Sequence, residues 1–182
     1  VFTIMAIRFY KPKEPYYEFS NFYISPIELD GLKWQTVEHY FQAQKFNQPH
    51  SPEHMEYYRL FSVTDTPMKA MMMGRQKGKG GYASQWKLHK TLDSRTVNEV
   101  IQLYKHLPMR SDWETVRVDV MRQGLRAKIQ QHPRIRKLLL ETGDAEIIED
   151  SPRDAFWGVG QNQLGKLWME LREEIKNEKS HS

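Results

Sequence analysis

The stretch TVEHYFQAQKF, residues 36–46, combines apolar residues at helical spacing with reactive polar side chains inside two turns. Thr36 is a typical helix N-cap, so this stretch is predicted to begin the first clear helix. Glu38 and Lys45 lie seven residues apart and nearly share one face, with Gln42 between them. On an average amphipathic helix such a stripe faces solvent. Because aromatic residues flank this one, we interpret it instead as a set of polar groups that face a ligand.

Few strands and many helices are indicated in the rest of the chain. Asp30-Gly31 predicts a tight turn between two short strands. The order of the elements predicts an α+β fold, mostly helical with a small β-sheet, as one compact domain over residues 5–176, with a disordered tail at 177–182. Helices are expected at 36–46, 52–63, 65–76, from Ser94 onward, 112–132, 134–144 and 163–175, and strands at 6–10, 26–29, 32–34 and 145–151.

Composition limits the possible functions. The 182 residues include no cysteine, which excludes a disulfide framework, a thiolate nucleophile and a cysteine-based zinc site. The seven histidines show no metal-ligand spacing, so neither a metal nor a cofactor is predicted. No apolar run approaches the ~20 residues of a membrane span, and an intracellular protein, cytoplasmic or nuclear, is expected. The net charge of +4 and pI of 9.2 fit a phosphate or nucleic-acid ligand, although many ordinary enzymes share them.

Three other stretches carry candidate binding residues. In EFSNF, residues 18–22, Ser20 and Asn21 either fix turns of their own loop or bind a ribose or a base. In MGRQKGKGG, residues 73–81, Arg75 stands among glycines and lysines, as a phosphate contact or as part of a solvated basic loop.

The third stretch is SPRDAFWGVGQNQLG, residues 151–165. Its Trp157 either stacks on a base or fills the core, and its Asp154 either acts on a ligand or caps a turn. His39, in the first helix, is a possible general acid or base, but a single histidine near a helix start is more often structural.

These stretches occur together, in this order, in one known family. The stretches concerned are EFSNF, PIELDGLKWQTVEHYFQAQKF, MGR, DWETVRVDVMRQGLRAK and LLLETGDAEIIEDSPRDAFWGVGQNQLGKLWMELR. On these stretches the chain resembles the NADAR (YbiA-like) family, from Arg8 to Arg172. It departs from the family at residues 127–129, where an aromatic residue is frequent, and in a glycine-rich insertion at 78–81. The resemblance implies a compact, mostly helical α+β fold and an enzyme that breaks N-glycosidic bonds. Family members hydrolyse early amino-uracil intermediates of riboflavin synthesis or remove ADP-ribose from guanine in DNA.

The resemblance also implies the site. It places active-site positions at Ser20, Asn21, Glu38, Lys45, Asp154 and Trp157. Of these we predict Glu38, Lys45 and Asp154 to be catalytic. The other three are predicted to bind substrate, together with Phe22, His39, Gln42, Arg75 and Gly158 from the same stretches.

A mechanism can be assigned to these residues as a hypothesis. Cleavage at a ribosyl C1 creates an oxocarbenium-like centre. Of Glu38 and Asp154, one would stabilise this cation or activate water, and the other would orient the departing base or protonate its nitrogen. Lys45 would either bind as a cation or, with a lowered pKa, attack C1 and form a Schiff base, which we favour. Trp157 would stack on a base, and Arg75 would meet a phosphate.

The mildly basic surface favours ADP-ribosyl-guanine in DNA or single-stranded nucleic acid as the substrate. A ribosylamino-pyrimidine phosphate of the riboflavin pathway is the alternative substrate. Two alternatives without catalysis are a module that binds ADP-ribose or NAD and a plain nucleic-acid binder, the latter disfavoured by a charge of only +4.

Overall fold

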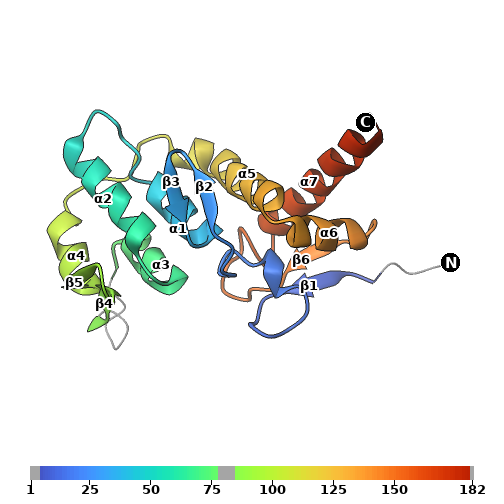
Figure 1. Ribbon diagram of the computed structural model, residues 1–182, viewed down its shortest axis with the longest axis horizontal. Helices are drawn as coiled ribbons and strands as arrows, with labels where there is room; N and C mark the ends of the chain where they lie inside the picture. The colour runs from blue at the N-terminus through green and yellow to red at the C-terminus, as the bar shows by residue number, and fades with distance from the viewer. Residues whose placement is uncertain (1–4, 78–84, 181–182) are drawn as a thin grey trace. The chain divides into compact units, whose positions relative to one another are not determined.

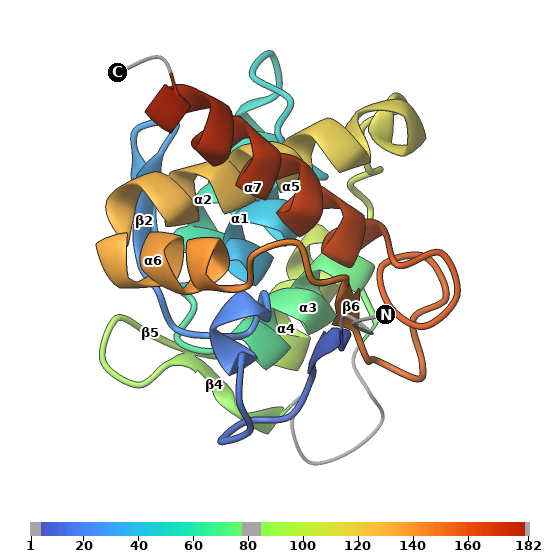
Figure 2. The ribbon, with the colours of Figure 1, turned by 90° about the vertical axis from the view of Figure 1, so that its right-hand side faces the viewer.

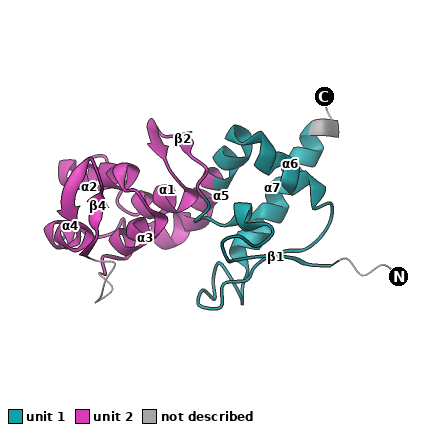
Figure 3. Ribbon diagram, turned by 60° about the horizontal axis from the view of Figure 1, so that its bottom comes forward, with its two compact units in different colours: residues 1–23, 125–182 teal, residues 24–124 magenta. Residues whose placement is uncertain are grey.

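The computed structural model describes residues 5–77 and 85–180, which form the two compact units coloured in Figure 3. Unit 1 consists of residues up to Tyr23 and from Leu125 onward, and unit 2 of Ile24–Gly124. Figure 1 shows that helices dominate and that the strands are short. The predicted α+β class is confirmed. In place of one small sheet, the described residues form three two-stranded sheets.

Unit 2 packs helices around the stretch quoted above. Helix α1 packs against both α2 and α3. The helices of this unit are α1 (Val37–Gln44), α2 (Pro52–Val63), α3 (Pro67–Arg75), α4 (Val97–Tyr104) and the first part of α5 (Trp113–Gln131), and its strands are β2 (Ile27–Leu29), β3 (Leu32–Trp34), β4 (Lys87–His89) and β5 (Asp93–Thr96).

The predicted hairpin is present as the antiparallel pair β2–β3. Asp30 has φ 54° and Gly31 has φ 79°, so both turn residues are left-handed, as a two-residue hairpin loop requires. Trp34, at the end of β3, is fully buried and meets Tyr40 of α1 and Tyr58 of α2 edge to face. The hairpin therefore supplies a core side chain immediately before α1 begins.

The β4–β5 hairpin was not predicted from the sequence, which indicated a helix from Ser94 onward. Ser94 lies instead in β5. Helix α4 begins three residues later, where Thr96 and Glu99 form a reciprocal capping box. Figures 1 and 2 show this hairpin beside α4. The predicted glycine-rich insertion at 78–81 falls outside the described residues.

Unit 1 is built from both ends of the chain. Strand β1 (Ile7–Phe9) pairs in parallel with β6 (Ile147–Glu149), so that Ile7 lies opposite Ile147. The other elements are a short 3₁₀ helix η1 (Tyr17–Phe19), the rest of α5, α6 (Pro133–Glu141) and α7 (Gln163–Ser180). Helix α7 continues to Ser180, well into the segment expected to be a disordered tail.

Helix α7 approaches β6 closely because of one glycine. A Cβ on Gly165 would lie 2.1 Å from the carbonyl oxygen of Ile147. Asn162, just before the helix, donates from Nδ2 to the same carbonyl at 2.9 Å and accepts from the Glu149 amide at 3.0 Å. The loop that precedes α7, which contains Asp154 and Trp157, is thus anchored at its far end to β6.

Candidate active site

Helix α1 is buried on every side. All of its residues, Val37–Gln44, are buried, including Glu38 at 8% exposure and Gln42 at 4%. Thr36 is extended and caps the helix by accepting from the backbone amide of His39. The simple alternative of a solvent-facing charged stripe is therefore wrong. A carboxylate is rarely buried without a specific partner, so the surroundings of Glu38 are informative.

Gln42 forms a hydrogen bond with Glu38. Its Nε2 donates to Glu38 Oε1 at 2.7 Å, one helical turn away. Gly74 of α3 makes room for this pair, because a Cβ there would lie 1.9 Å from Gln42 Oε1 and 2.8 Å from Gln42 Cβ. The absence of a side chain at residue 74 thus lets α3 lie directly against the amide that orients the carboxylate.

Lys45 follows α1 and is only partly exposed. Burial lowers its pKa from 10.5 to about 8, while Glu38 raises the pKa, Arg75 lowers it and Glu114 raises it. The Nζ atom lies 6.0 Å from the centre of the Trp113 ring. A primary amine with a pKa near 8 is partly neutral at physiological pH, which an amine nucleophile requires.

Arg75 is exposed at the end of α3. Its charge reaches Lys45, whose pKa it lowers. The guanidinium therefore adds positive charge to the surroundings of Lys45, which favours an anionic part of a ligand. That role in phosphate binding stays a prediction.

His39 is held inside the fold by both ring nitrogens. Nδ1 lies 2.7 Å from Thr36 Oγ1, and Nε2 donates to the Thr64 carbonyl at 2.8 Å. Its exposure is 0%, and burial lowers its pKa from 6.5 to about 4, so the ring is neutral. Since both nitrogens are occupied, this placement favours the structural alternative over contact with substrate.

The loop after η1 holds the predicted binding residues Ser20, Asn21 and Phe22, all in unit 1. Ser20 Oγ accepts from the Phe22 amide at 3.1 Å, so this hydroxyl shapes its own turn. Asn21 is buried at 8% exposure, whereas Ser20 and Phe22 are partly exposed. The turn-forming alternative is thus present for Ser20, and binding of ribose by any of the three stays a prediction.

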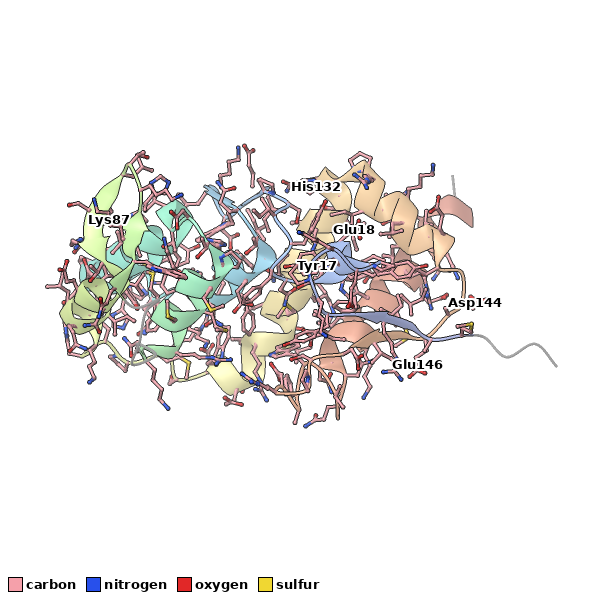
Figure 4. All side chains as sticks on the ribbon, turned by 90° about the horizontal axis from the view of Figure 1, so that it is seen from below. Tyr17, Glu18, Lys87, His132, Asp144 and Glu146 are labelled. Carbon is pink, nitrogen blue, oxygen red and sulfur yellow. The ribbon has the colours of Figure 1, made fainter. Side chains whose placement is uncertain are left out.

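Lys128 of α5 contacts this loop from the core and was not singled out from the sequence. It is fully buried, and its Nζ donates to the Ser20 carbonyl at 3.0 Å. The same atom lies 5.7 Å from the ring centre of Tyr23 and 5.6 Å from that of Trp168. Burial lowers its pKa from 10.5 to about 7, against the opposing effect of Glu18, which Figure 4 labels on η1.

This buried amine predicts a specific pH dependence of stability. Between pH 7 and 10.5 the unfolded chain binds a proton at Lys128 that the folded chain does not. The free energy of unfolding should therefore rise with pH in that window, by up to about 1.4 kcal/mol per pH unit from this residue. Denaturant unfolding at several pH values should show that Lys128→Met loses this part of the slope.

Lys137→Met, at an exposed lysine of α6, is the matched control for this substitution. For Lys137→Met, the slope of the unfolding free energy against pH should equal that of the unmodified protein. Equal slopes in the unmodified protein and in Lys128→Met would contradict the prediction.

Asp154, Trp157 and Gly158 lie in a second loop of unit 1, before α7. Asp154 Oδ1 accepts from the Trp157 amide at 2.9 Å and from the Phe156 amide at 3.1 Å, which makes it a turn cap. A Cβ on Gly158 would lie 2.7 Å from the Ser151 carbonyl oxygen. Asp154 thus has a structural task in this loop, and its catalytic task stays a prediction.

Trp157 is partly exposed and does not belong to the buried core. Its ring meets Phe156 edge to face at 4.8 Å. An accessible indole in a loop fixed by hydrogen bonds suits stacking on a base. The alternative of a core plug does not hold.

The structure therefore gathers part of the predicted site in unit 2 and part in unit 1. Around α1 it brings together Glu38, Gln42 and Lys45, with Arg75 in electrostatic reach. Trp113 beside Lys45 was missed as a neighbour, although it lies in the quoted block that begins at Asp112. The remaining predicted residues lie in two loops of unit 1.

Residues 5–77 and 85–180 include no group of three or more His, Cys, Asp or Glu side chains placed to hold a metal ion. No helix within the same ranges is long and apolar enough to cross a membrane.

A buried carboxylate with an amine of lowered pKa in electrostatic reach is an arrangement typical of enzyme sites. A family model of the NADAR domain matches residues 8–176. The chain belongs to the NADAR family.

Three relatives give this assignment its detail. The N-glycosidase YbiA of Escherichia coli is 39% identical over 178 residues, 95% of this chain and 90% of that protein. Its NMR structure has a TM-score of 0.73 at 36% identity and covers 100% of this chain and 91% of its own. An N-glycosidase of Nostoc punctiforme is 35% identical over 95% of this chain and 94% of that protein.

The third relative, the riboflavin biosynthesis protein PYRR of Zea mays, is 32% identical over 93% of this chain but only 25% of that protein. The predicted fold, family and N-glycosidase class are confirmed by these similarities. The choice of substrate and the residue roles are not tested by them.

Proposed function

We propose that this chain removes ADP-ribose from guanine bases of nucleic acid. The observation that carries the proposal is the α1 cluster, in which buried Glu38, held by Gln42, lies in electrostatic reach of an amine whose pKa is about 8. The N-glycosidase class of the relatives supports cleavage at a ribosyl C1. The net charge of +4 favours a polyanionic substrate.

The chemistry follows from the two groups. Neutral Lys45 attacks C1 of the ribose with its nitrogen lone pair, and the bond from C1 to the base nitrogen breaks. The leaving base takes up a proton, and Glu38 stabilises the positive charge that develops at C1. The sugar ring opens to an imine with Lys45, and water then hydrolyses the imine, which releases ADP-ribose and restores the amine. Every atom comes from the substrate, the lysine or water.

Asp154 and Trp157 have proposed roles of their own. The family resemblance assigns a carboxylate task to Asp154 and stacking to Trp157. Asp154→Asn keeps the shape and the turn-capping oxygen, and therefore separates the charge of this residue from its structural task. A loss of kcat with an unchanged unfolding midpoint supports the carboxylate role, and an unchanged kcat removes it.

The second candidate substrate is a ribosylamino-pyrimidine phosphate of the riboflavin pathway. It is favoured by relatives named as riboflavin biosynthesis proteins in Zea mays and Vibrio vulnificus. The same cleavage of an N-glycosidic bond would serve either substrate. An ADP-ribose-binding module without catalysis is disfavoured, since the relatives that cover nearly the whole chain are named as enzymes. An intracellular location stays a prediction.

One assay with two substrates tests the proposal. The purified protein is incubated with an oligonucleotide that carries ADP-ribosylated guanine, and separately with the ribosylamino-uracil phosphate, and release of the base is followed with and without EDTA. Release of unmodified guanine that is insensitive to EDTA and lost in Lys45→Ala supports the proposal. Cleavage of the uracil compound alone overturns it in favour of the second candidate. Cleavage of neither, with tight binding of ADP-ribose, overturns both.

Glu38→Gln should lower kcat about 10²- to 10⁴-fold, because the amide keeps the size of the side chain but loses its negative charge. Glu38 raises the pKa of Lys45, so the variant should also shift the Lys45 limb of the pH–rate profile to lower pH. Steady-state rates from pH 6 to 10 measure both effects. Gln42→Glu, which adds a carboxylate next to Glu38, should shift that limb the opposite way. A Glu38→Gln variant with an unchanged rate would rule out the proposed role.

A further inference from the structure

A groove of about 760 Å³ lies in unit 2, between the start of α3 and the β4–β5 hairpin. None of the residues that line it belongs to the predicted active site. The lining residues are Asp65, Thr66, Lys69, Trp86, Lys87, His89, Lys90 and Thr91.

The groove carries an excess of positive charge. Its lining includes three lysines and one aspartate. Lys69 is committed to Asp65, since Lys69 Nζ lies 2.6 Å from Asp65 Oδ1 and both side chains are largely buried. Lys87 and Lys90 are exposed, and Figure 4 shows Lys87 on the β4–β5 hairpin. Among the described residues, Lys87 and Lys90 are in no ion pair, and they place positive charge at the exposed wall of the groove, where an anion can reach it.

Trp86 adds a flat apolar surface to the same groove. Its side chain is 43% exposed, although Lys69 Nζ lies 6.0 Å from the ring centre. The backbone is fixed, because the Trp86 carbonyl accepts from the Val97 amide at 2.9 Å where α4 begins. A partly exposed indole on a fixed backbone, beside two exposed lysines, has the composition of a surface that stacks an unpaired base and neutralises its phosphates.

The groove also lies close to the α1 cluster within unit 2. Asp65 directly follows Thr64, whose carbonyl accepts from His39 of α1, the neighbour of Glu38. Helix α3 carries Lys69 near its start and Gly74, which touches Gln42, near its end. The five helical steps from Lys69 to Gly74 span about 7.5 Å along the helix axis. A nucleic-acid strand covers that axial distance in about two stacked steps.

We propose that this groove binds single-stranded nucleic acid that flanks the modified base, with a base on Trp86 and phosphates at Lys87 and Lys90. The inference rests on the proposed function and adds where the strand next to the modified base binds and that this strand is single. In a duplex, neighbouring base pairs cover both faces of each base, and none is open to the indole. A single strand is therefore preferred to a duplex.

Binding of a short, fluorescein-labelled, unmodified oligothymidylate to the whole protein tests the groove, with fluorescence anisotropy as the readout. Trp86→Ala should weaken binding about 5- to 150-fold, and Trp86→Phe, which keeps a ring, should restore most of it. Lys87→Glu with Lys90→Glu should lower the slope of log Kd against log salt by about 1.4 or more. Lys33→Glu, at an exposed lysine of β3, is the matched charge control. Equal affinities in all these variants would overturn the proposal.

Kinetics separate this proposal from the function it rests on. For the groove variants, the ratio of kcat/KM on the ADP-ribosylated oligonucleotide to kcat/KM on ADP-ribosylated guanosine should fall about as much as binding does. If both substrates are cleaved and this ratio stays constant, the groove proposal fails and the proposed function stands. If neither is cleaved but the oligothymidylate binds through Trp86, the groove stands as a nucleic-acid site and the proposed function fails.

Discussion

Lys45→Ala is expected to lower kcat about 10²- to 10⁴-fold on the substrate that the protein cleaves, with little loss of stability. The substitution removes the amine that the mechanism uses as its nucleophile. Lys45 is partly exposed, and burial costs its charged form, as the pKa of about 8 indicates. Its removal should therefore not destabilise the fold greatly. Steady-state turnover and a thermal unfolding curve of the same preparation measure the two effects.

Lys45→Arg decides between the two roles left open for this residue. Arginine keeps the positive charge but does not form an imine, because it stays protonated. If Lys45 acts as a cation, Lys45→Arg should keep substantial activity, and the wild-type rate should fall as pH rises through 8. If Lys45 is the nucleophile, Lys45→Arg should be as inactive as Lys45→Ala, and the rate should rise as pH rises through 8.

Reduction with cyanoborohydride gives an independent result on the same question. An imine between Lys45 and the opened sugar would be reduced to a stable amine, and the mass of the chain would increase by that of the attached sugar. Wild-type protein should show this adduct and Lys45→Ala should not. An adduct that persists in Lys45→Ala would place the nucleophile at another residue.

Gly74→Ala is expected to lower the free energy of unfolding by about 1–3 kcal/mol through overpacking. The new Cβ would lie 1.9 Å from Gln42 Oε1, 2.6 Å from Gln42 Cδ and 2.8 Å from Gln42 Cβ. Rotation of the amide relieves the first two contacts but not the third, so α1 and α3 must also move apart. Because the displaced amide binds Glu38, the substitution should lower kcat as well. Denaturant unfolding and turnover measure these changes.

The double variant Gly74→Ala with Gln42→Ala is the control for this explanation. Removing the amide removes two of the three close contacts, so part of the lost stability should return relative to Gly74→Ala alone. Activity should stay low, since Glu38 no longer has its partner. If the losses in unfolding free energy of Gly74→Ala and Gln42→Ala simply add in the double variant, the two sites are not coupled. The close contact between residues 74 and 42 would then not be the cause of the lost stability.

Local signals in the sequence predicted much of the fold. The Asp-Gly pair in the β2–β3 turn and Thr36 at the start of α1 act through their own backbone neighbourhood. Pro67 likewise begins α3 at a position where its missing amide costs nothing. These features need no distant contact, and a sequence pattern can therefore reveal them.

The β4–β5 hairpin was not predictable in the same way. Its strands are short, and Asp93, Ser94 and Arg95 lack the alternating apolar pattern of a strand. Serine is a common helix-capping residue, and for this reason the helix was predicted to begin at Ser94, which lies in the hairpin. The true cap at Thr96 is distinguished by its reciprocal bond with Glu99.

By itself, the sequence determined the class of this protein through its resemblance to a known family. It also determined the spacing of Glu38, Gln42 and Lys45, which follows from covalent connectivity and the helical period. Only the tertiary structure decided what those side chains experience. Burial of all of α1, the missing side chain of Gly74 and the charge of Arg75 come from other elements, and these contacts orient Glu38 and lower the pKa of Lys45. Desolvation depends on what surrounds a group in space, and that is set by residues far away in the chain.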